Sequence, residues 1–153
     1  MKPLVSFLLI SLLAVFTFAY DQKVTVVGNF LCGNVISNGT EMILKEHDWI
    51  DFDDVLSTAA TYENGSFEIT GYENEFFKIS PYLEVIHSCG VTQGSVAMCS
   101  ITTLWIPEGI SYYKMGTINL LDQQASRPKG CSIQRAFFLK AKAVSTVWNI
   151  FGL

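Results

Sequence analysis

The chain between Tyr20 and Ile133 alternates apolar and polar residues in one segment after another. In Lys23–Cys32, the apolar residues Val24 and Val26 fall on one face of an extended chain. Successive side chains of a β-strand point to opposite faces, so this alternation predicts half-buried strands. No stretch of this region keeps a 3.6-residue apolar period for three helical turns. We predict seven strands, at Lys23–Cys32, Glu41–His47, Val55–Tyr62, Ser66–Thr70, Tyr82–Cys89, Ile101–Ile106 and Tyr112–Leu121.

The connections between these strands are short and rich in turn residues. Asn38-Gly39 and Asn64-Gly65 each lie between two strand-like runs. Asn-Gly accepts positive φ at both central positions of a type I′ turn, whose twist matches that of the flanking strands. Short turns join antiparallel strands, whereas parallel strands need long crossovers. The fold class we predict is therefore all-β, an antiparallel β-sandwich of seven to eight strands.

Residues 1–19 are typical of a secretory signal peptide. Lys2 supplies the positive charge, Leu4–Phe18 is largely apolar, and Thr17-Phe18-Ala19 offers small residues for the peptidase. We expect cleavage after Ala19, so that the mature protein begins at Tyr20 and is secreted into the extracellular space.

The C-terminal extension, residues 134–153, differs in composition from the rest and carries no charge after Lys142. Two interpretations stay open: a surface-lying helix that would hold the protein at a cell surface, or a tail outside the fold. A lipid-anchor signal fits less well because the polar spacer is poor. The uncharged run is too short to cross a bilayer as a helix. The apolar anchors of a surface-lying helix would be Phe137, Phe138, Trp148 and Phe151.

Length and charge narrow the class of protein further. The chain has 153 residues and a formal net charge of −4, which suits one domain, residues 20–133. That domain contains fourteen acidic and six basic residues, a net charge of −8. A nucleic-acid-binding protein needs a basic surface, so we predict an acidic secreted domain with no nucleic-acid partner.

Four cysteines, an even number, lie beyond the predicted cleavage site. In an oxidising compartment they imply two disulfides, and three pairings are possible. We favour Cys89–Cys99, which would close one strand connection, together with Cys32–Cys131. The spacings do not fit a zinc site. A catalytic thiol is not expected either, because it would need a free cysteine in a secreted protein.

Two glycosylation sequons coincide with the Asn-Gly turns. Asn38-Gly39-Thr40 and Asn64-Gly65-Ser66 both carry the acceptor pattern. Exposed turns of a secreted protein leave room for a glycan, so we expect glycosylation at Asn38 and Asn64.

Several short motifs occur in a fixed order between Val24 and Cys131: Val27–Cys32, Asp51–Leu56, Asn64–Gly71, Pro81–Leu83 with His87–Cys89, the single Cys99, and Met115–Leu120. In their order and spacing they resemble the nematode transthyretin-like proteins, a large group of small secreted domains. The resemblance implies a transthyretin-like β-sandwich, secretion, and a non-enzymatic role in extracellular binding or signalling. Two departures stand out. Ser132–Leu153 has no counterpart, and Ser100 occupies a position that is usually basic.

An alternative function is a divergent hydrolase of the hydroxyisourate type, since those enzymes resemble this sandwich. They end in a Tyr-Arg-Gly-Ser signature that this chain lacks, with Cys131-Ser132-Ile133 near the expected position. The two histidines, His47 and His87, lack a second base that would converge with them and an arginine that would hold an anionic substrate. We expect a packed His87 near a disulfide and a solvated His47. We therefore predict no catalytic residues.

The acidic segment before Val55 raises the question of a metal. Hard cations favour carboxylate oxygens, but the spacing does not match an EF-hand loop. We favour a solvated acidic loop, and predict no metal site and no cofactor. The residues concerned are Glu46, Asp48, Asp51, Asp53 and Asp54.

Aromatic residues in or beside predicted loops give the remaining indication of function. Most such residues pack locally, but a contiguous exposed patch would mark an interface. The partner could be an extracellular protein, a small hydrophobic ligand or a cell-surface lipid, and edge strands could also pair into a homo-oligomer. The loop aromatics are Trp49, Phe52, Phe76, Phe77, Tyr112 and Tyr113.

Overall fold

The computed structural model describes residues 20–48, 52–91 and 99–126. The predicted signal peptide, Asp51, Trp49, Cys131 and the C-terminal extension lie outside these ranges. The described residues form nine strands and one short 3-10 helix: β1 (Tyr20–Cys32), β2 (Val35–Ile36), β3 (Glu41–Glu46), β4 (Asp54–Ala60), β5 (Ser66–Glu75), β6 (Pro81–His87), β7 (Ser100–Trp105), β8 (Tyr112–Asn119), η1 (Leu120–Asp122) and β9 (Ala125–Ser126). The seven longer strands match the seven predicted ones, which confirms the all-β fold class.

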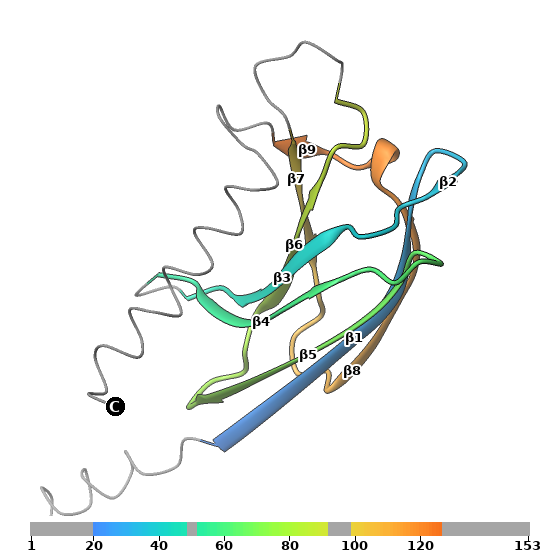
Figure 1. Cartoon of the computed structure of the whole chain (residues 1–153). Coiled ribbons are helices and arrows are strands. Elements are labelled where there is room, and N and C mark those ends of the chain that lie inside the picture. The colour runs from blue at the N-terminus through green and yellow to red at the C-terminus, as the bar shows by residue number, and fades with distance from the viewer. Residues whose placement is uncertain (1–19, 49–51, 92–98, 127–153) are drawn as a thin grey trace, which may run out of the picture.

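The strands form two sheets packed face to face (Figure 1). One sheet has the order β2-β1-β5, with β8 on the other side of β1, and the second has the order β4-β3-β6-β7-β9. Most neighbours are antiparallel, but β8 runs parallel to β1. The chain crosses from β7 to the opposite sheet at the end where β1 begins, and the Thr25 amide there donates to the Ser111 carbonyl at 2.9 Å. Strand β8 therefore starts beside β1 and follows its direction.

The core lies between the two sheets and follows from the alternation. Val24, Val26 and Phe30 of β1 face Met42 and Leu44 of β3, and all are buried. The sheets approach each other closely at Gly71 of β5. A Cβ atom built there would lie 2.6 Å from Cβ of Leu56 and 2.9 Å from Cδ2 of Leu44. This position therefore has no room for a side chain.

The Asn-Gly turns form, but not as type I′ turns. Gly39 and Gly65 have φ of 64° and 76°, and no non-glycine residue of the described part has positive φ. In the second turn the Gly65 amide donates to the Tyr62 carbonyl, and the Tyr62 amide donates to the Ser66 carbonyl. This is a three-residue loop with glycine in the left-handed position, the geometry of a type I turn followed by a left-handed residue. The turns were predicted correctly and the turn type was wrong. Each turn joins strands of different sheets, β2 to β3 and β4 to β5.

A disulfide between Cys32 and Cys89 links the two sheets, with their Cα atoms 5.6 Å apart. The predicted pairings Cys89–Cys99 and Cys32–Cys131 are therefore wrong. Cys32 ends β1 and Cys89 follows β6, so both lie at the same end of the sandwich on opposite sheets. Cys99 is also disulfide-bonded. Among the described residues, no helix is long and apolar enough to cross a membrane.

Candidate binding site at the mouth of the sandwich

The inward faces of three strands change from apolar to polar at the end of the sandwich opposite the Cys32–Cys89 disulfide. On β1 the alternation that buries Val24 continues outward through Gln22 to Tyr20. On β5 it continues from Gly71 through Glu73 to Glu75, and on β3 it ends at Glu46. We call this end of the inter-sheet space the mouth, defined by Tyr20, Gln22, Glu46, Glu73 and Glu75.

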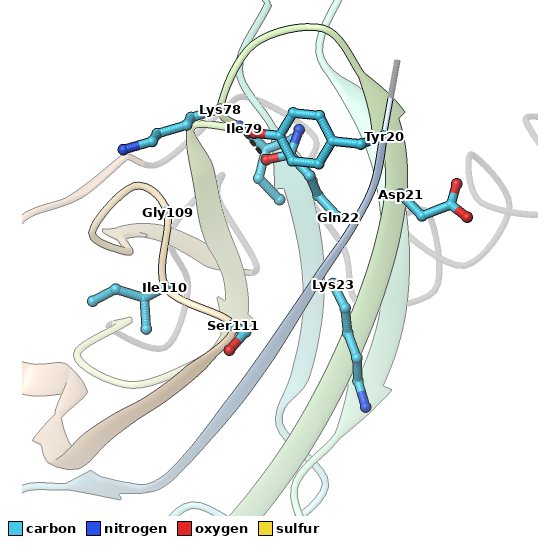
Figure 2. A pocket seen from close by; sticks show the side chains of 9 residues that line it. All are labelled: Tyr20, Asp21, Gln22, Lys23, Lys78, Ile79, Gly109, Ile110 and Ser111. Atoms are coloured by element: carbon cyan, nitrogen blue, oxygen red, sulfur yellow. Dashed lines mark hydrogen bonds between the residues drawn. The ribbon is translucent and has the colours of Figure 1, made fainter. Parts of the chain in front are cut away.

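The β1 side of the mouth holds a pocket of about 260 Å³. Gln22 builds one wall: its Nε2 donates to the Phe77 carbonyl at 2.6 Å, and its Oε1 accepts from the Ile79 amide at 3.2 Å. One side chain thus holds the β5–β6 connection against β1. Figure 2 shows Ile110 and Ser111 of the β7–β8 connection across the pocket from Tyr20. The residues that line it are Tyr20, Asp21, Gln22, Lys23, Lys78, Ile79, Gly109, Ile110 and Ser111.

Exposed apolar side chains lie in this pocket and in the segment that leads into it. Tyr20 and Ile110 line the pocket and are 49 % and 37 % exposed. Phe76 and Phe77, which precede the lining residue Lys78, are 48 % and 83 % exposed. Exposed apolar groups gathered around a concave surface are typical of an interface rather than of scattered surface residues. Of the six aromatics predicted from sequence, the five that the structure describes do not line the pocket, although the Phe77 carbonyl accepts a hydrogen bond from Gln22 in its wall. Phe52, Phe76, Phe77 and Tyr112 are exposed, Tyr113 packs on the core, and Trp49 lies outside the described residues.

Sequence reasoning missed Tyr20 and Ile110. Tyr20 is the first residue of a long strand, and its place on the inward face follows from the β1 alternation. That signal was present in the sequence. Ile110 belongs to a turn before β8, and its proximity to β1 depends on the parallel pairing, which the sequence did not indicate.

The other side of the mouth is acidic. Oxygens of Glu46, Asp48 and Glu75 lie within 4.8 Å of one another. Glu46 is only 4 % exposed. Burial, followed by the charges of Asp48, Glu75, Glu73 and Asp54, raises the pKa of Glu46 from 4.5 to about 7. The interpretation of a solvated acidic loop is therefore wrong for Glu46, which folds inward and is joined by acids of β5.

Asp53, from the same predicted acidic loop, has a separate role. It accepts hydrogen bonds from the Tyr82 hydroxyl and, at 2.9 Å, from Nδ1 of His47. The Tyr82 bond is the main cause that lowers the pKa of Asp53. The Trp105 ring lies 5.0 Å from the Tyr82 ring and 5.8 Å from the His47 ring. His47 is therefore half-buried and paired, not solvated as predicted.

The second histidine is buried at the opposite end, as predicted. His87 is 3 % exposed and its Nε2 lies 2.9 Å from the Thr102 hydroxyl. It lines a second pocket, of about 310 Å³, beside the Cys32–Cys89 disulfide and the Asn38 turn. The His47 amide donates to the Ser80 carbonyl just before β6, whereas His87 ends β6. A strand of that length separates the two histidines by roughly 20 Å, so they cannot act on one substrate.

The fold and the site define a class of protein, a small β-sandwich whose two sheets are linked by a disulfide at one end and which carries a pocket at the other. A family model described as the transthyretin-like family matches residues 27–107. The chain belongs to the transthyretin-like family.

Two curated relatives agree with this assignment. Transthyretin-like protein 16 of Caenorhabditis elegans is 39 % identical over 89 residues, which cover 58 % of this chain and 67 % of that protein. Transthyretin-like protein 5 of the same organism is 36 % identical over 69 residues, covering 44 % of this chain and 50 % of that protein. The chain thus matches half to two thirds of the length of these relatives.

Among solved structures, the crystal structure of (S)-allantoin synthase is similar over 72 % of this chain and 45 % of its own, with 11 % identity and a TM-score of 0.47. A likeness at that level says nothing about the activity of this chain.

Proposed function

We propose that this protein is a secreted, non-enzymatic transthyretin-like domain that binds an extracellular protein partner through the pocket at its mouth. The observation that carries the proposal is a concave surface lined by the exposed side chains of Tyr20 and Ile110. The exposed Phe76 and Phe77 belong to the β5–β6 connection that Gln22 holds against β1 at this pocket. Large aromatic residues at the centre of an interface supply most of its binding energy.

Secretion is supported by the signal-like residues 1–19 and by the Cys32–Cys89 disulfide. Disulfides persist in oxidising compartments and are rare in the cytosol. The mature protein would carry its sugars on Asn38 and Asn64, both exposed at turns of the end opposite the mouth. Glycans at those positions would leave the pocket accessible.

The absence of catalysis is supported by how the titratable groups of the described residues are engaged. His47 pairs with Asp53, His87 is buried against Thr102, and the two are far apart. The pocket itself is lined by Lys23, Lys78 and Asp21 but by no histidine. The Asp21 carboxylate points away from the other lining side chains and accepts from Asn74 (Figure 2). General acid–base chemistry needs a convergent donor and acceptor near one substrate atom.

The test uses the secreted protein, fluorescently labelled, on intact nematode cells. The proposal predicts saturable binding that unlabelled protein competes away, and no turnover of 5-hydroxyisourate. Hydroxyisourate turnover that is lost in a His47→Gln or His87→Gln variant would favour the hydrolase alternative instead. Binding that never saturates would contradict a specific partner.

A further inference from the structure

The acidic side of the mouth has the composition of a cation site. The core face of β3 runs from Met42 through Leu44 to Glu46, and the core face of β5 runs from Ile69 through Gly71 to Glu73 and Glu75. Two apolar faces that pack against each other thus end, at the same level, in carboxylates. Like charges that face each other are destabilising unless something compensates for them.

Glu46 supplies the second, independent observation. Its side chain is more than nine-tenths buried, and its Oε2 has no hydrogen-bond partner among the described residues. Buried polar atoms are nearly always satisfied, so one without a partner indicates a bound group that completes it. The same side chain contributes an oxygen to the cluster with Asp48 and Glu75.

The spacing of these oxygens fits a cation. Their mutual distances of 4.8 Å or less match two ligands on opposite sides of one ion, since calcium binds oxygens at roughly 2.4 Å. All the ligand atoms are oxygens, so the site would not favour soft metal ions, which bind sulfur ligands. Calcium accepts six to eight oxygens in flexible geometry, whereas magnesium demands an octahedron and keeps most of its water. Carboxylates of two different sheets suit the flexible ion.

We propose that Glu46, Asp48 and Glu75 bind one calcium ion between the two sheets at the mouth of the sandwich. Glu73 and Asp54 lie near enough to add negative charge. The ion would link β3 to β5 at this end, as the Cys32–Cys89 disulfide links the sheets at the other. Because Glu75 is paired with Tyr20 across the β5–β1 ladder, the ion would also order the strand that forms the pocket wall.

The test is calorimetric titration of the EDTA-treated full-length secreted protein with calcium chloride in 0.15 M salt. We expect one saturable site with Kd on the order of 10⁻⁴ to 10⁻³ M, the range of extracellular modules, and a higher Tm with calcium. Magnesium chloride should bind at least about tenfold more weakly. Equal or tighter magnesium binding would overturn the assignment to calcium.

Matched variants locate the site. Glu75→Gln and Glu46→Gln should each weaken calcium binding about tenfold or more, as loss of one charged ligand requires. Glu63→Gln, an exposed carboxylate in the turn at the other end of β5, should leave it unchanged. If Glu46→Gln fails to fold, the calcium affinity of Glu75→Gln, at a half-buried position, is by itself the test of the site. No heat and no Tm shift with millimolar calcium, or equal affinity in Glu75→Gln and Glu63→Gln, would overturn the proposal.

Discussion

Cys32 at the end of β1 and Cys89 just after β6 form a disulfide that joins one sheet of the sandwich to the other. The two cysteines are separated by 57 residues in the sequence, so the bond closes a long loop. In the chain-entropy model such a bond stabilises the folded state chiefly by restricting the unfolded chain.

Removing this bond should therefore be costly. The double variant Cys32→Ser, Cys89→Ser is expected to lose about 4 kcal/mol of unfolding free energy, the loop-closure value for a loop of this length. Urea unfolding of the secreted protein measures the loss. A change below about 1 kcal/mol would show that the sheets do not depend on this link.

Gly71 marks a close approach of the two sheets, and its replacement tests the packing there. Gly71→Ala should destabilise the fold by about 1–3 kcal/mol, because the added methyl group meets Leu56 and Leu44. Glu68→Ala, an exposed position of the same strand, is the control and should change little. A neutral or stabilising Gly71→Ala, as expected for an open strand position, would contradict the tight contact.

The buried carboxyl of Glu46 predicts a pH dependence in calcium-free buffer. The pKa of the Glu46 carboxyl is about 7 in the folded protein, against an ordinary value of 4.5 that applies to the unfolded chain. The folded state therefore binds a proton on Glu46 more tightly than the unfolded state does. The effect on stability is absent below pH 4.5, where both states are protonated. As the pH rises from 4.5 to 7, the free energy of unfolding falls. The total loss is about 3 kcal/mol and is complete above pH 7.

Glu46→Gln removes that dependence on pH. In EDTA the variant should be more stable than the parent at pH 8, by about 3 kcal/mol, and nearly equal to it at pH 4. Urea unfolding at the two pH values gives both differences. A stability difference that is the same at pH 4 and pH 8 would mean that Glu46 titrates normally in the fold.

Glycosylation at the two turns predicts a measurable mass. Asn38 and Asn64 are both exposed, and we expect the intact mass of the secreted protein to fall by two glycans on treatment with a glycosidase. Asn38→Gln and Asn64→Gln should each remove one glycan. An intact mass that the glycosidase leaves unchanged would contradict glycosylation at both.

The strands could be predicted from sequence because alternation is a local signal. The apolar residues Val24, Val26 and Phe30 recur at even positions and face the core, and β1 forms there as expected. The two-residue strands β2 and β9 were not predicted, since two residues show no period. The parallel direction of β8 was missed because it depends on where the chain crosses between sheets.

Contacts between the sheets were harder to predict for the same reason. Cys32 meets Cys89, and Glu46 meets Glu75, because of the order of strands in two different sheets. No pattern within one strand reveals which strand lies opposite. The acidic segment could thus be recognised from sequence as a cluster, whereas the burial of Glu46 and the contribution of β5 could not.

Competition between matched variants tests the binding role of the mouth most directly. Phe77 and Phe52 are both highly exposed phenylalanines, 83 % and 91 %, and of the two only Phe77 has a backbone carbonyl held by Gln22 at the pocket. With labelled protein on nematode cells, unlabelled Phe77→Ser should compete roughly tenfold less well than the parent, the effect of losing one large aromatic side chain from an interface. Phe52→Ser should compete as the parent does. Equal competition by Phe77→Ser and the parent would contradict binding through the mouth.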